Sequence, residues 1–253
     1  MYYSADIGVI GGSGFYKLTD LDARRVVIDT PYGKPSDTFS IINYKNQKIA
    51  FLPRHGKDHT LAPAEINYLA NIDAFAQLGV KAMILPCCVG SLREDFKPGD
   101  YVVTDQYINF TSGRKDTFYS SPQVVSVSAA DPYDASMRKM ALEAGRKLGF
   151  TMHDGGTIGV INGPRFSTRA ESKMFKMLGA DIVNMTQYPE AYLCQEKGIP
   201  VVNIALVTDY DAGLEGNPGI KPVTSEAIKE MLDKNVDNMR QLITVMVECL
   251  GAK

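Results

Sequence analysis

Short apolar runs alternate with amphipathic segments along the chain. Apolar runs at residues 5–10 and 199–207 are typical of strands buried on both faces of a parallel sheet. Two further runs that meet at Asn46 predict a hairpin. In chain order, the pattern predicts strands at residues 5–10, 26–30, 40–44, 48–52, 82–85, 100–108, 157–161, 180–185 and 199–207.

Apolar positions at helical spacing predict helices at residues 65–78 and 137–148. Thr168 and Glu171 have capping-box spacing and predict a helix that ends at Gly179. Apolar residues from Ile228 to Leu250 recur at the same spacing, so a long terminal helix is expected over residues 225–250. Between these elements, residues 111–134 are rich in Ser, Gly and Asp and predict a long loop. The alternation of strands and helices predicts an α/β fold, with residues 1–253 as a single domain around a central mixed β-sheet flanked by helices.

Composition places the chain among soluble globular proteins. It has 253 residues, of which 45% are hydrophobic and 22% charged. A net charge of −2 argues against a nucleic-acid partner, and no apolar run has the length that a membrane span requires. The first residues, MYYSAD, lack a signal-peptide pattern, and the four cysteines have no metal-site or disulfide spacing. A cytoplasmic protein with reduced thiols is therefore expected.

Two segments that follow predicted strands suit an anion. The glycine turn GVIGGSGFY, residues 8–16, allows close backbone approach, and Ser13 adds a hydroxyl donor. In PRHG, residues 53–56, Arg54 has a planar fork that fits phosphate oxygens, and His55 can donate one more hydrogen bond. A tight strand-to-helix turn and a surface arginine explain these two motifs equally well. No metal site is expected at His55 and His59, because no third ligand has convincing spacing.

Three further segments contain polar groups at the ends of predicted strands. PCCVGSL, residues 86–92, is read as a turn of small residues, and its cysteines are more commonly buried small residues than a redox pair. NMTQYPEA, residues 184–191, places Met185 and Thr186 just after a strand. Asp209 and Asp211 follow the last apolar run, where open α/β sheets bind ligands, and their carboxylates suit hydrogen bonding to a base such as a purine. A strand-end cap is the alternative for this pair.

Taken in order, six motifs resemble those of the methylthioadenosine phosphorylases in the trimeric purine nucleoside phosphorylase group. They are GVIGGSGFY, PRHGKDHTLAPAEINYLANIDAF, GSLREDFKPGDYVVTDQYI, NGPRFSTRAES, NMTQYPEA and VTDYDAG. The similarity covers residues 5–213 and, more loosely, the terminal helix. It implies a nucleoside phosphorylase-like fold, with inorganic phosphate as co-substrate and no cofactor. It also implies a homotrimer, or a hexamer of paired trimers, in which each site includes residues from a neighbouring subunit.

The same resemblance implies roles for individual residues. Those matching the phosphate site are Ser13, Arg54, His55 and Thr186, with Cys87, next to Cys88, at a position where many members have threonine. Those matching the nucleoside site are Met185 against the ribose, Phe166 and Ser167 beside the base, and Thr208, Asp209 and Asp211 in the purine pocket. Ser126 lies where several members have a histidine near the sugar's 5′ end, which leaves open a methylthio or a hydroxyl group there.

The reaction implied is phosphorolysis of S-methyl-5′-thioadenosine to adenine and 5-methylthio-α-D-ribose 1-phosphate, a step of purine and methionine salvage. In it, Asp209 would protonate the purine at N7 and Asp211 would accept a hydrogen bond from the 6-amino group. Two alternatives stay open from the sequence. One is a phosphorylase for 6-oxopurine nucleosides such as methylthioinosine, inosine or guanosine, and the other is a purine nucleoside-binding protein without turnover.

Overall fold

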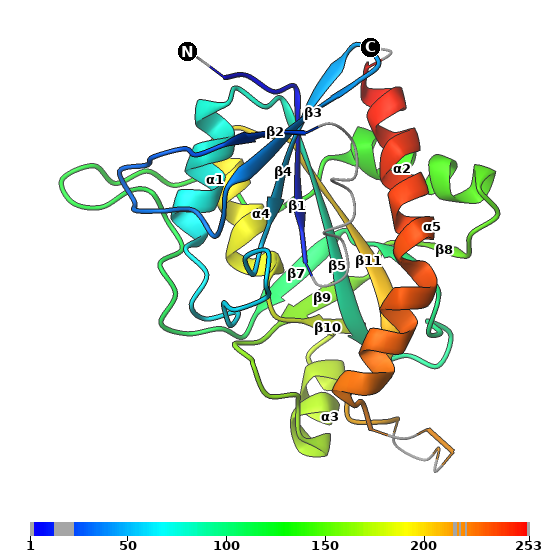
Figure 1. The fold of residues 1–253 in the computed structure, drawn as a ribbon. Coiled ribbons are helices and arrows are strands. Elements are labelled where there is room, and N and C mark those ends of the chain that lie inside the picture. Colours follow the sequence, from blue (N-terminus) through cyan, green and yellow to red (C-terminus); the bar gives the residue numbers. More distant parts are fainter. Residues whose placement is uncertain (1–2, 13–22, 215–216, 218, 221, 252–253) are drawn as a thin grey trace.

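The computed structural model describes residues 3–12, 23–214, 217, 219–220 and 222–251 (Figure 1). The strands are β1 (Ile7–Gly11), β2 (Ala23–Val26), β3 (Phe39–Tyr44), β4 (Gln47–Pro53), β5 (Ala82–Ser91), β6 (Tyr101–Val103), β7 (Gln106–Asn109), β8 (Met152–Asp154), β9 (Thr157–Val160), β10 (Ile182–Asn184) and β11 (Val201–Asp209). The helices are α1 (Tyr68–Gln77), α2 (Ala135–Lys147), α3 (Arg169–Met177), α4 (Gln187–Glu196) and α5 (Ser225–Gly251).

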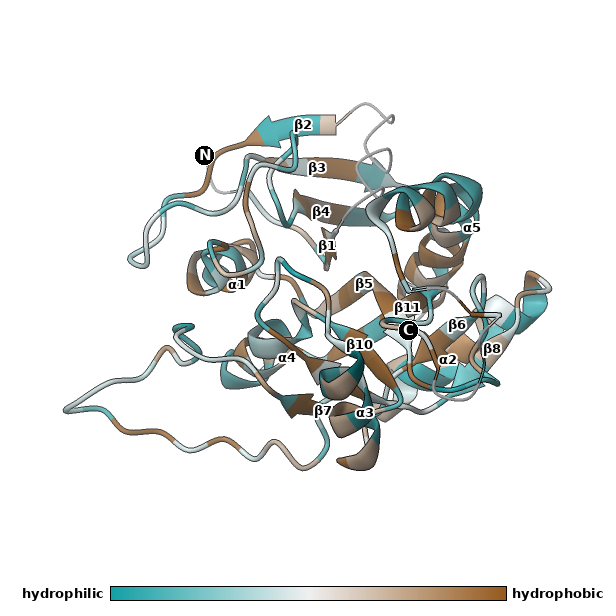
Figure 2. Cartoon of the chain, turned by 90° about the horizontal axis from the view of Figure 1, so that it is seen from below, coloured by the Kyte–Doolittle hydropathy of each residue, from teal (hydrophilic) through white to brown (hydrophobic). Residues whose placement is uncertain are grey.

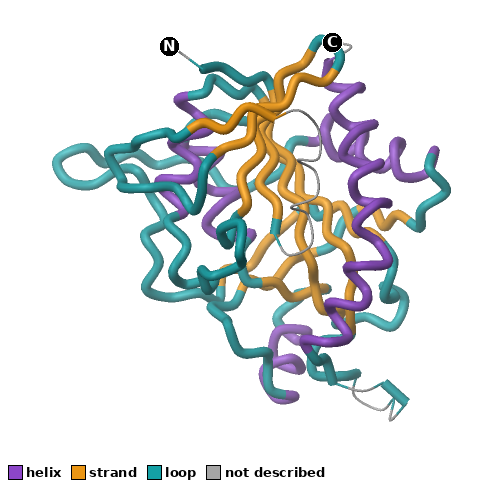
Figure 3. Tube along the Cα trace, viewed as in Figure 1, coloured by secondary structure: helices purple, strands orange, loops and turns teal. Residues whose placement is uncertain are grey.

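All the described strands belong to one mixed sheet, so the predicted fold class is confirmed (Figure 3). The order along its main path is β2-β3-β4-β1-β5-β10-β9-β7, while β11 pairs with β5 and β6, and β6 pairs with β8. Strands β1, β4, β5 and β11 form the parallel centre, and β2, β3 and β4 are antiparallel. The parallel centre brings the carboxyl ends of several strands to one edge, where ligands bind in such folds.

Helices cover both faces of the sheet (Figure 1). Helices α1 and α4 lie on one face, and α2 and α5 lie on the other. Successive residues of β5 alternate between the two cores, with Met83 in the apolar cluster of Phe75 and Leu193 and Ile84 in that of Met246. Each such buried side chain stabilises the fold by about 1.5–3 kcal/mol. Helix α5 has hydrophilic and hydrophobic residues along its length, as expected for a helix with one face on a sheet (Figure 2).

Two strand predictions are wrong in their bounds. The strand expected at residues 26–30 is β2, which ends at Val26 because Val26 pairs with Phe39, the first residue of β3. The strand expected at residues 100–108 is two strands, β6 and β7, which pair with different neighbours. The break lies at Thr104, which donates to Asn203, and Asp105, which accepts from the backbone of Gly156.

Some elements were not predicted, and others are confirmed. Strand β8 and helix α4 had no prediction; α4 contains Pro189, and the backbone of Tyr188 just before it is non-helical. The long loop at residues 111–134 has no helix or strand. Thr168 and Glu171 form the expected reciprocal capping box of α3, and α5 spans the predicted terminal helix. None of the helices in the described ranges is long and apolar enough to cross a membrane.

Candidate active site

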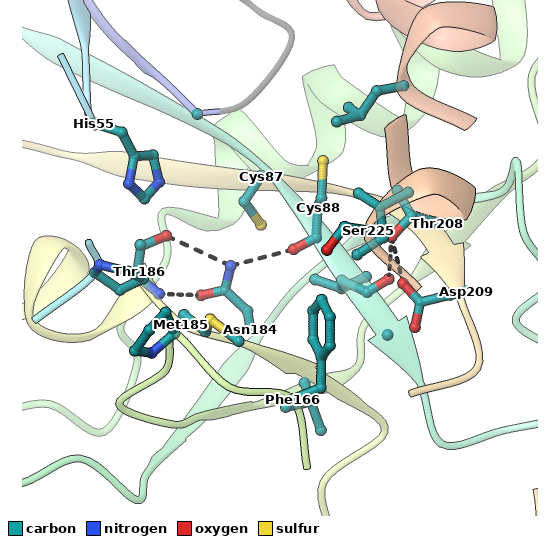
Figure 4. Close-up of a pocket in the computed structure, with 18 of the residues that line it drawn as sticks. His55, Cys87, Cys88, Phe166, Asn184, Met185, Thr186, Thr208, Asp209 and Ser225 are labelled. Atoms are coloured by element: carbon teal, nitrogen blue, oxygen red, sulfur yellow. Dashed lines mark hydrogen bonds between the residues drawn. The ribbon is translucent and has the colours of Figure 1, made fainter. Parts of the chain in front are cut away.

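A cavity of about 710 Å³ opens at the carboxyl edge of the parallel strands (Figure 4). Its volume falls within the range of about 300–1,000 Å³ that is typical of small-molecule sites. Ten of the predicted site residues line it: Arg54, His55, Cys87, Cys88, Phe166, Met185, Thr186, Thr208, Asp209 and Asp211. Ser167 is not among the described residues that line the cavity. Its hydroxyl is next to the carboxyl group of Asp211. Ser13 lies outside the described residues.

The floor of the cavity is a strand rather than the predicted turn. Residues 86–91 continue β5, which at ten residues is longer than the strand expected at residues 82–85. Because β1 ends at Gly11 and β4 at Pro53, β5 extends past both of them. Strand β10 runs antiparallel to β5 and brings Asn184 beside Cys88, whose carbonyl accepts from the Asn184 amide at 3.3 Å. This arrangement places the segment after β10 opposite the ends of β1 and β4.

Arg54 is fully buried and paired with Glu190 of α4. Its Nε and Nη2 donate to the two carboxylate oxygens of Glu190 at 2.5 and 2.8 Å, and Nη2 also donates to the carbonyl of Ile10 at 3.0 Å. Burial acts to lower the pKa of Arg54, but attraction and hydrogen bonding by Glu190 outweigh it and raise that pKa. Nη1 faces Gly12, where a Cβ would lie 2.8 Å from it. Nη1 also donates to the carbonyl of Pro86 at 3.4 Å, so the guanidinium is fixed by its neighbours where it lines the cavity.

Asn184 fixes the start of α4 next to Arg54. Its Oδ1 accepts from the backbone N–H groups of Thr186 and Gln187 at 2.6 and 2.8 Å. Thr186 lines the cavity on the same side as His55 (Figure 4). Asn184 and Glu190 were not predicted as site residues. An Asn just before a helical segment is a recognisable cap, but the sequence has no signal for the pairing of Glu190 with Arg54.

His55 is buried and neutral at physiological pH. Burial, together with the nearby charge of Arg54, lowers its pKa to about 4. Its Nδ1 lies 2.9 Å from the carbonyl of Leu61, which can only accept, so Nδ1 has the proton and Nε2 is an acceptor. In this state Nδ1 donates to Leu61 and Nε2 accepts, so the predicted hydrogen bond from His55 to an anion stays a prediction that requires the protonated ring.

The two neighbouring cysteines have thiols of low reactivity. Burial raises the pKa of Cys87 to about 11 and that of Cys88 well above its ordinary value. Because the thiolate is the reactive form, neither residue suits nucleophilic or redox chemistry at neutral pH. Cys87 packs in the cluster of Val207, and Cys88 packs against that of Leu206, as expected for adjacent residues of a strand.

Asp209 lies across the cavity from His55 and Thr186 (Figure 4). One carboxylate oxygen lies 2.7 Å from Oγ1 of Thr208, and the other accepts from the backbone N–H of Asp211 at 2.7 Å. Burial raises the pKa of Asp209 to about 6, against the effect of these two hydrogen bonds. A carboxyl group with this pKa has a proton available near neutral pH, which a general acid requires.

A β-bulge and a glycine position the two carboxylates. The pairing of β11 with β5 shifts between Val207 and Asp209, so Thr208 is the extra residue. At Gly90 on β5, a Cβ would lie 2.9 Å from Oδ1 of Asp209 and 3.0 Å from Cα of Asp211. No other residue type fits there without displacing both aspartates.

Asp211 has a backbone φ of 50°, in the left-handed region that Asp tolerates better than most residues. Burial raises the pKa of its carboxyl, while the nearby hydroxyls of Ser172 and Ser167 oppose that rise. Within the described part of the chain, Oδ2 of Asp211 and Oγ of Ser167 are buried with no hydrogen-bond partner. Buried polar atoms without partners are rare in native proteins, so Oδ2 of Asp211, a residue that lines the cavity, is available to a ligand.

Arg114, from the long loop, joins two walls of the cavity and was not predicted. Its guanidinium donates to the carbonyls of Met185, Asn162 and Tyr188, with Met185 at 2.8 Å, and it lies over the ring of Tyr68. The Asn162 segment continues into the wall that contains Phe166. Helix α5 completes the lining with Ser225, Ile228, Lys229, Leu232 and Asp233, none of which was predicted.

Residues 6–248 match the sequence model of the Phosphorylase superfamily. The chain belongs to this superfamily. Relatives in it include the S-methyl-5′-thioadenosine phosphorylase of Thermofilum pendens, which is 46% identical over 242 residues, covering 95% of this chain and 90% of that protein. That of Nitrosopumilus maritimus is 44% identical over 249 residues, covering 98% and 93%. The resemblance inferred from the motifs is confirmed.

Solved structures of phosphorylases share the whole fold. A methylthioadenosine phosphorylase sourced from an antarctic soil metagenomic library superposes with a TM-score of 0.92 at 39% identity, over 99% of this chain and 88% of that one. Methylthioadenosine phosphorylase from Schistosoma mansoni in complex with adenine gives a TM-score of 0.92 at 35% identity, over 99% and 93%. A mutant of the S. mansoni enzyme has been solved in complex with methylthioadenosine.

Proposed function

We propose that this phosphorylase cleaves S-methyl-5′-thioadenosine with inorganic phosphate, giving adenine and 5-methylthio-α-D-ribose 1-phosphate. The observation that supports this most directly is a single cavity with two chemically different sides. The guanidinium of Arg54 and the hydroxyl of Thr186 belong to one side, and the carboxyl groups of Asp209 and Asp211 belong to the other. The reaction needs an anion at the sugar carbon and a proton donor at the departing base, so both kinds of group must face the same enclosed space.

Phosphate binds at the Arg54 side in this mechanism. Breaking the N-glycosidic bond creates positive charge on the sugar and negative charge on the departing purine. Phosphate next to the sugar stabilises the positive charge and then forms the new bond at the same carbon. Met185, between the two sides, lies against the ribose, and Arg114 fixes its backbone.

Asp209 protonates the departing purine at N7. Its raised pKa of about 6 keeps part of the population protonated near neutral pH. Help from a positioned general acid typically contributes about 10²–10⁴ in rate. Thr208 and the backbone of Asp211 fix the direction of this carboxyl group, so the proton is delivered to one place.

Asp211 and Ser167 recognise the base in this proposal. The partnerless Oδ2 of Asp211 accepts a hydrogen bond from the 6-amino group of adenine, and Phe166 contacts the ring. Asp211→Asn replaces one acceptor oxygen with a donor, so we expect the preference to shift toward 6-oxopurine nucleosides. The ratio of kcat/KM for methylthioadenosine to that for methylthioinosine measures this shift. An unchanged ratio in a folded variant would remove Asp211 from base recognition.

Release of base from methylthioadenosine, adenosine, methylthioinosine and inosine, each with and without phosphate, tests the proposed function. We expect phosphate-dependent release of adenine, fastest from methylthioadenosine. Release of hypoxanthine alone would favour the 6-oxopurine alternative, and saturable binding without any release would favour a nucleoside-binding protein. The pair of carboxyl groups supports the 6-aminopurine substrate over the first alternative.

The surroundings of the reaction are part of the same proposal. We infer that the enzyme acts in the cytoplasm as a homotrimer, or as a hexamer of paired trimers, and needs no cofactor besides its co-substrate phosphate. The four cysteines are free thiols, which supports a reducing compartment. Light scattering of the purified protein distinguishes trimer from hexamer.

A further inference from the structure

A buried hydrogen-bonded chain runs from Thr104 through Asn203 to Cys87 on the floor of the cavity. Asn203 lies in the middle of the apolar strand β11, and both it and Thr104 are fully buried. The hydroxyl of Thr104 donates to Oδ1 of Asn203 at 3.0 Å. Nδ2 of Asn203 donates to the carbonyl of Leu85 at 2.6 Å and to Sγ of Cys87 at 3.2 Å. Buried polar groups in an apolar core are costly unless satisfied, and here every amide atom has a partner.

The geometry fixes the direction of each bond in this chain. A backbone carbonyl such as that of Leu85 can only accept, so the amide nitrogen of Asn203 must face it. The same nitrogen then donates to the sulfur of Cys87, which acts as the acceptor. The hydrogen of the Cys87 thiol is therefore free to point in another direction.

That direction is available in the cavity. Cys87 lines it, and Figure 4 shows Cys87 between the His55–Thr186 side and Cys88. Arg54 lies close enough for its charge to act on the thiol. Burial keeps the pKa of Cys87 at about 11, so the thiol retains its hydrogen at neutral pH. A thiol is a weaker donor than a hydroxyl, so its orientation matters more.

We propose that Thr104 and Asn203 are positioning residues that turn the S–H group of Cys87 toward an anion bound beside Arg54. The inference rests on the proposed function, in which that anion is phosphate. It assigns a role to Asn203, the polar residue within the apolar stretch 201–207 of β11, and to Thr104, the residue at which β6 and β7 separate. Neither Thr104 nor Asn203 lines the cavity in the described structure, so both act through Cys87.

The steady-state rate of adenine release, measured against phosphate and against nucleoside separately, tests this proposal. We expect Asn203→Leu and Thr104→Val each to raise the KM for phosphate by about 2–10-fold, the range for loss of one neutral hydrogen bond, with the nucleoside KM unchanged. In a Cys87→Ala background, neither substitution should raise the phosphate KM further, because the thiol through which they act is gone. An equal fold-change in both backgrounds, or parallel changes in both KM values, would overturn it.

Infrared difference spectra of the unchanged protein give a second readout, in which a variant serves only to assign the band. In the unchanged protein, inorganic phosphate should shift one S–H stretching band, and Cys87→Ser should abolish that band. Saturable phosphate binding without any shift would contradict the proposal. Absence of both turnover and phosphate binding in the unchanged protein would instead contradict the proposed function, so the two failures are distinguishable.

Discussion

The Arg54 side and the Asp209 side of the cavity place their polar groups in opposite ways. On the Arg54 side, polar groups already have partners: the charge of Arg54 is paired with Glu190 through two short bonds, and the neutral ring of His55 with the carbonyl of Leu61. On the Asp209 side, the two aspartates have no cationic partner in the described residues, and one oxygen of Asp211 has no hydrogen-bond partner. Both sides are buried, but one holds an ordered cation paired with Glu190 and the other holds carboxyl groups of raised pKa.

This difference follows from the roles of the two ligands. An anion is bound best by a preorganised cation whose position does not change during the reaction. Glu190 fixes the position of Arg54 in this way, although burying the two charges is unfavourable. A departing base needs a proton, which only a carboxyl group of raised pKa supplies near neutral pH. The comparison predicts that changes on the first side act on stability and phosphate binding, whereas changes on the second act on turnover.

The largest effect is expected on the Asp209 side. Asp209→Asn keeps the shape of the side chain but removes the transferable proton, so kcat should fall by about 10²–10⁴ without loss of stability. Steady-state kinetics and thermal unfolding of the variant measure the two quantities. Asp233→Asn, which changes another carboxyl group lining the cavity, is the matched control and should leave kcat nearly unchanged. Near-normal turnover of a folded Asp209→Asn variant would remove Asp209 as the acid.

The next largest effect is expected from breaking the ion pair between Arg54 and Glu190. Glu190→Gln leaves the buried guanidinium of Arg54 without a counter-charge, which typically costs about 3–5 kcal/mol of folding free energy. Denaturant unfolding measures this loss. Glu230→Gln breaks an exposed pair with Lys234 and should change stability little. Equal small effects of both substitutions would show that Arg54 does not depend on Glu190.

Stability should also respond to pH in opposite senses on the two sides. The pKa of His55 is lowered to about 4, so between about pH 6.5 and 4 the unfolded chain binds a proton that the native protein does not. Its contribution of about 3 kcal/mol is therefore lost as pH falls through that window. The raised pKa of Asp209, about 6, gives the opposite sign: its contribution is present below about pH 4 and lost as pH rises through 6.

Unfolding free energies from pH 4 to 7 for the unchanged protein, His55→Gln and Asp209→Asn separate these two contributions. His55→Gln should be less sensitive to acid than the unchanged protein. Asp209→Asn should gain relative stability as the pH rises through 6. If both substitutions changed the slope of unfolding free energy against pH in the same direction, the electrostatic contrast between the two sides would be wrong.

The smallest effects are expected from one added methyl group on each side. In Gly90→Ala the new Cβ contacts Asp209 and the backbone of Asp211, so kcat should fall and folding should lose about 1–3 kcal/mol. In Gly12→Ala the new Cβ contacts Nη1 of Arg54, so the KM for phosphate should rise instead. Separate titrations of nucleoside and phosphate compare the two variants. The same kinetic change in both would contradict a two-sided cavity.

Much of this contrast is beyond what the sequence can predict. Buried strands and the terminal helix follow from apolar periodicity, and ten lining residues follow from motifs at the ends of strands. The sequence does not indicate that Glu190 pairs with Arg54, because they are separated by 136 positions and meet only through packing. Helix α4 was missed since Pro189 interrupts its pattern. The turn expected at residues 86–92 is strand, because its small residues pair with β11 over Cys87 and Cys88.

The protonation states were the other part that the sequence could not determine. The donor role predicted for His55 stays a prediction; the tautomer of its neutral ring follows from the carbonyl of Leu61, which is close only in the folded loop. The acid role of Asp209 stays a prediction, supported by a pKa of about 6 whose largest cause is burial. Local motifs indicate which residues form the site, whereas their charges depend on the fold.

Identification of the sugar product tests the central claim most directly. Methylthioadenosine would be incubated with the purified protein and phosphate labelled with oxygen-18, and the products analysed by phosphorus NMR and mass spectrometry. The account predicts one equivalent of 5-methylthioribose 1-phosphate whose bridging oxygen comes from phosphate, together with adenine. Free 5-methylthioribose with an oxygen from water would mean hydrolysis, and would contradict the role assigned to the Arg54 side of the cavity.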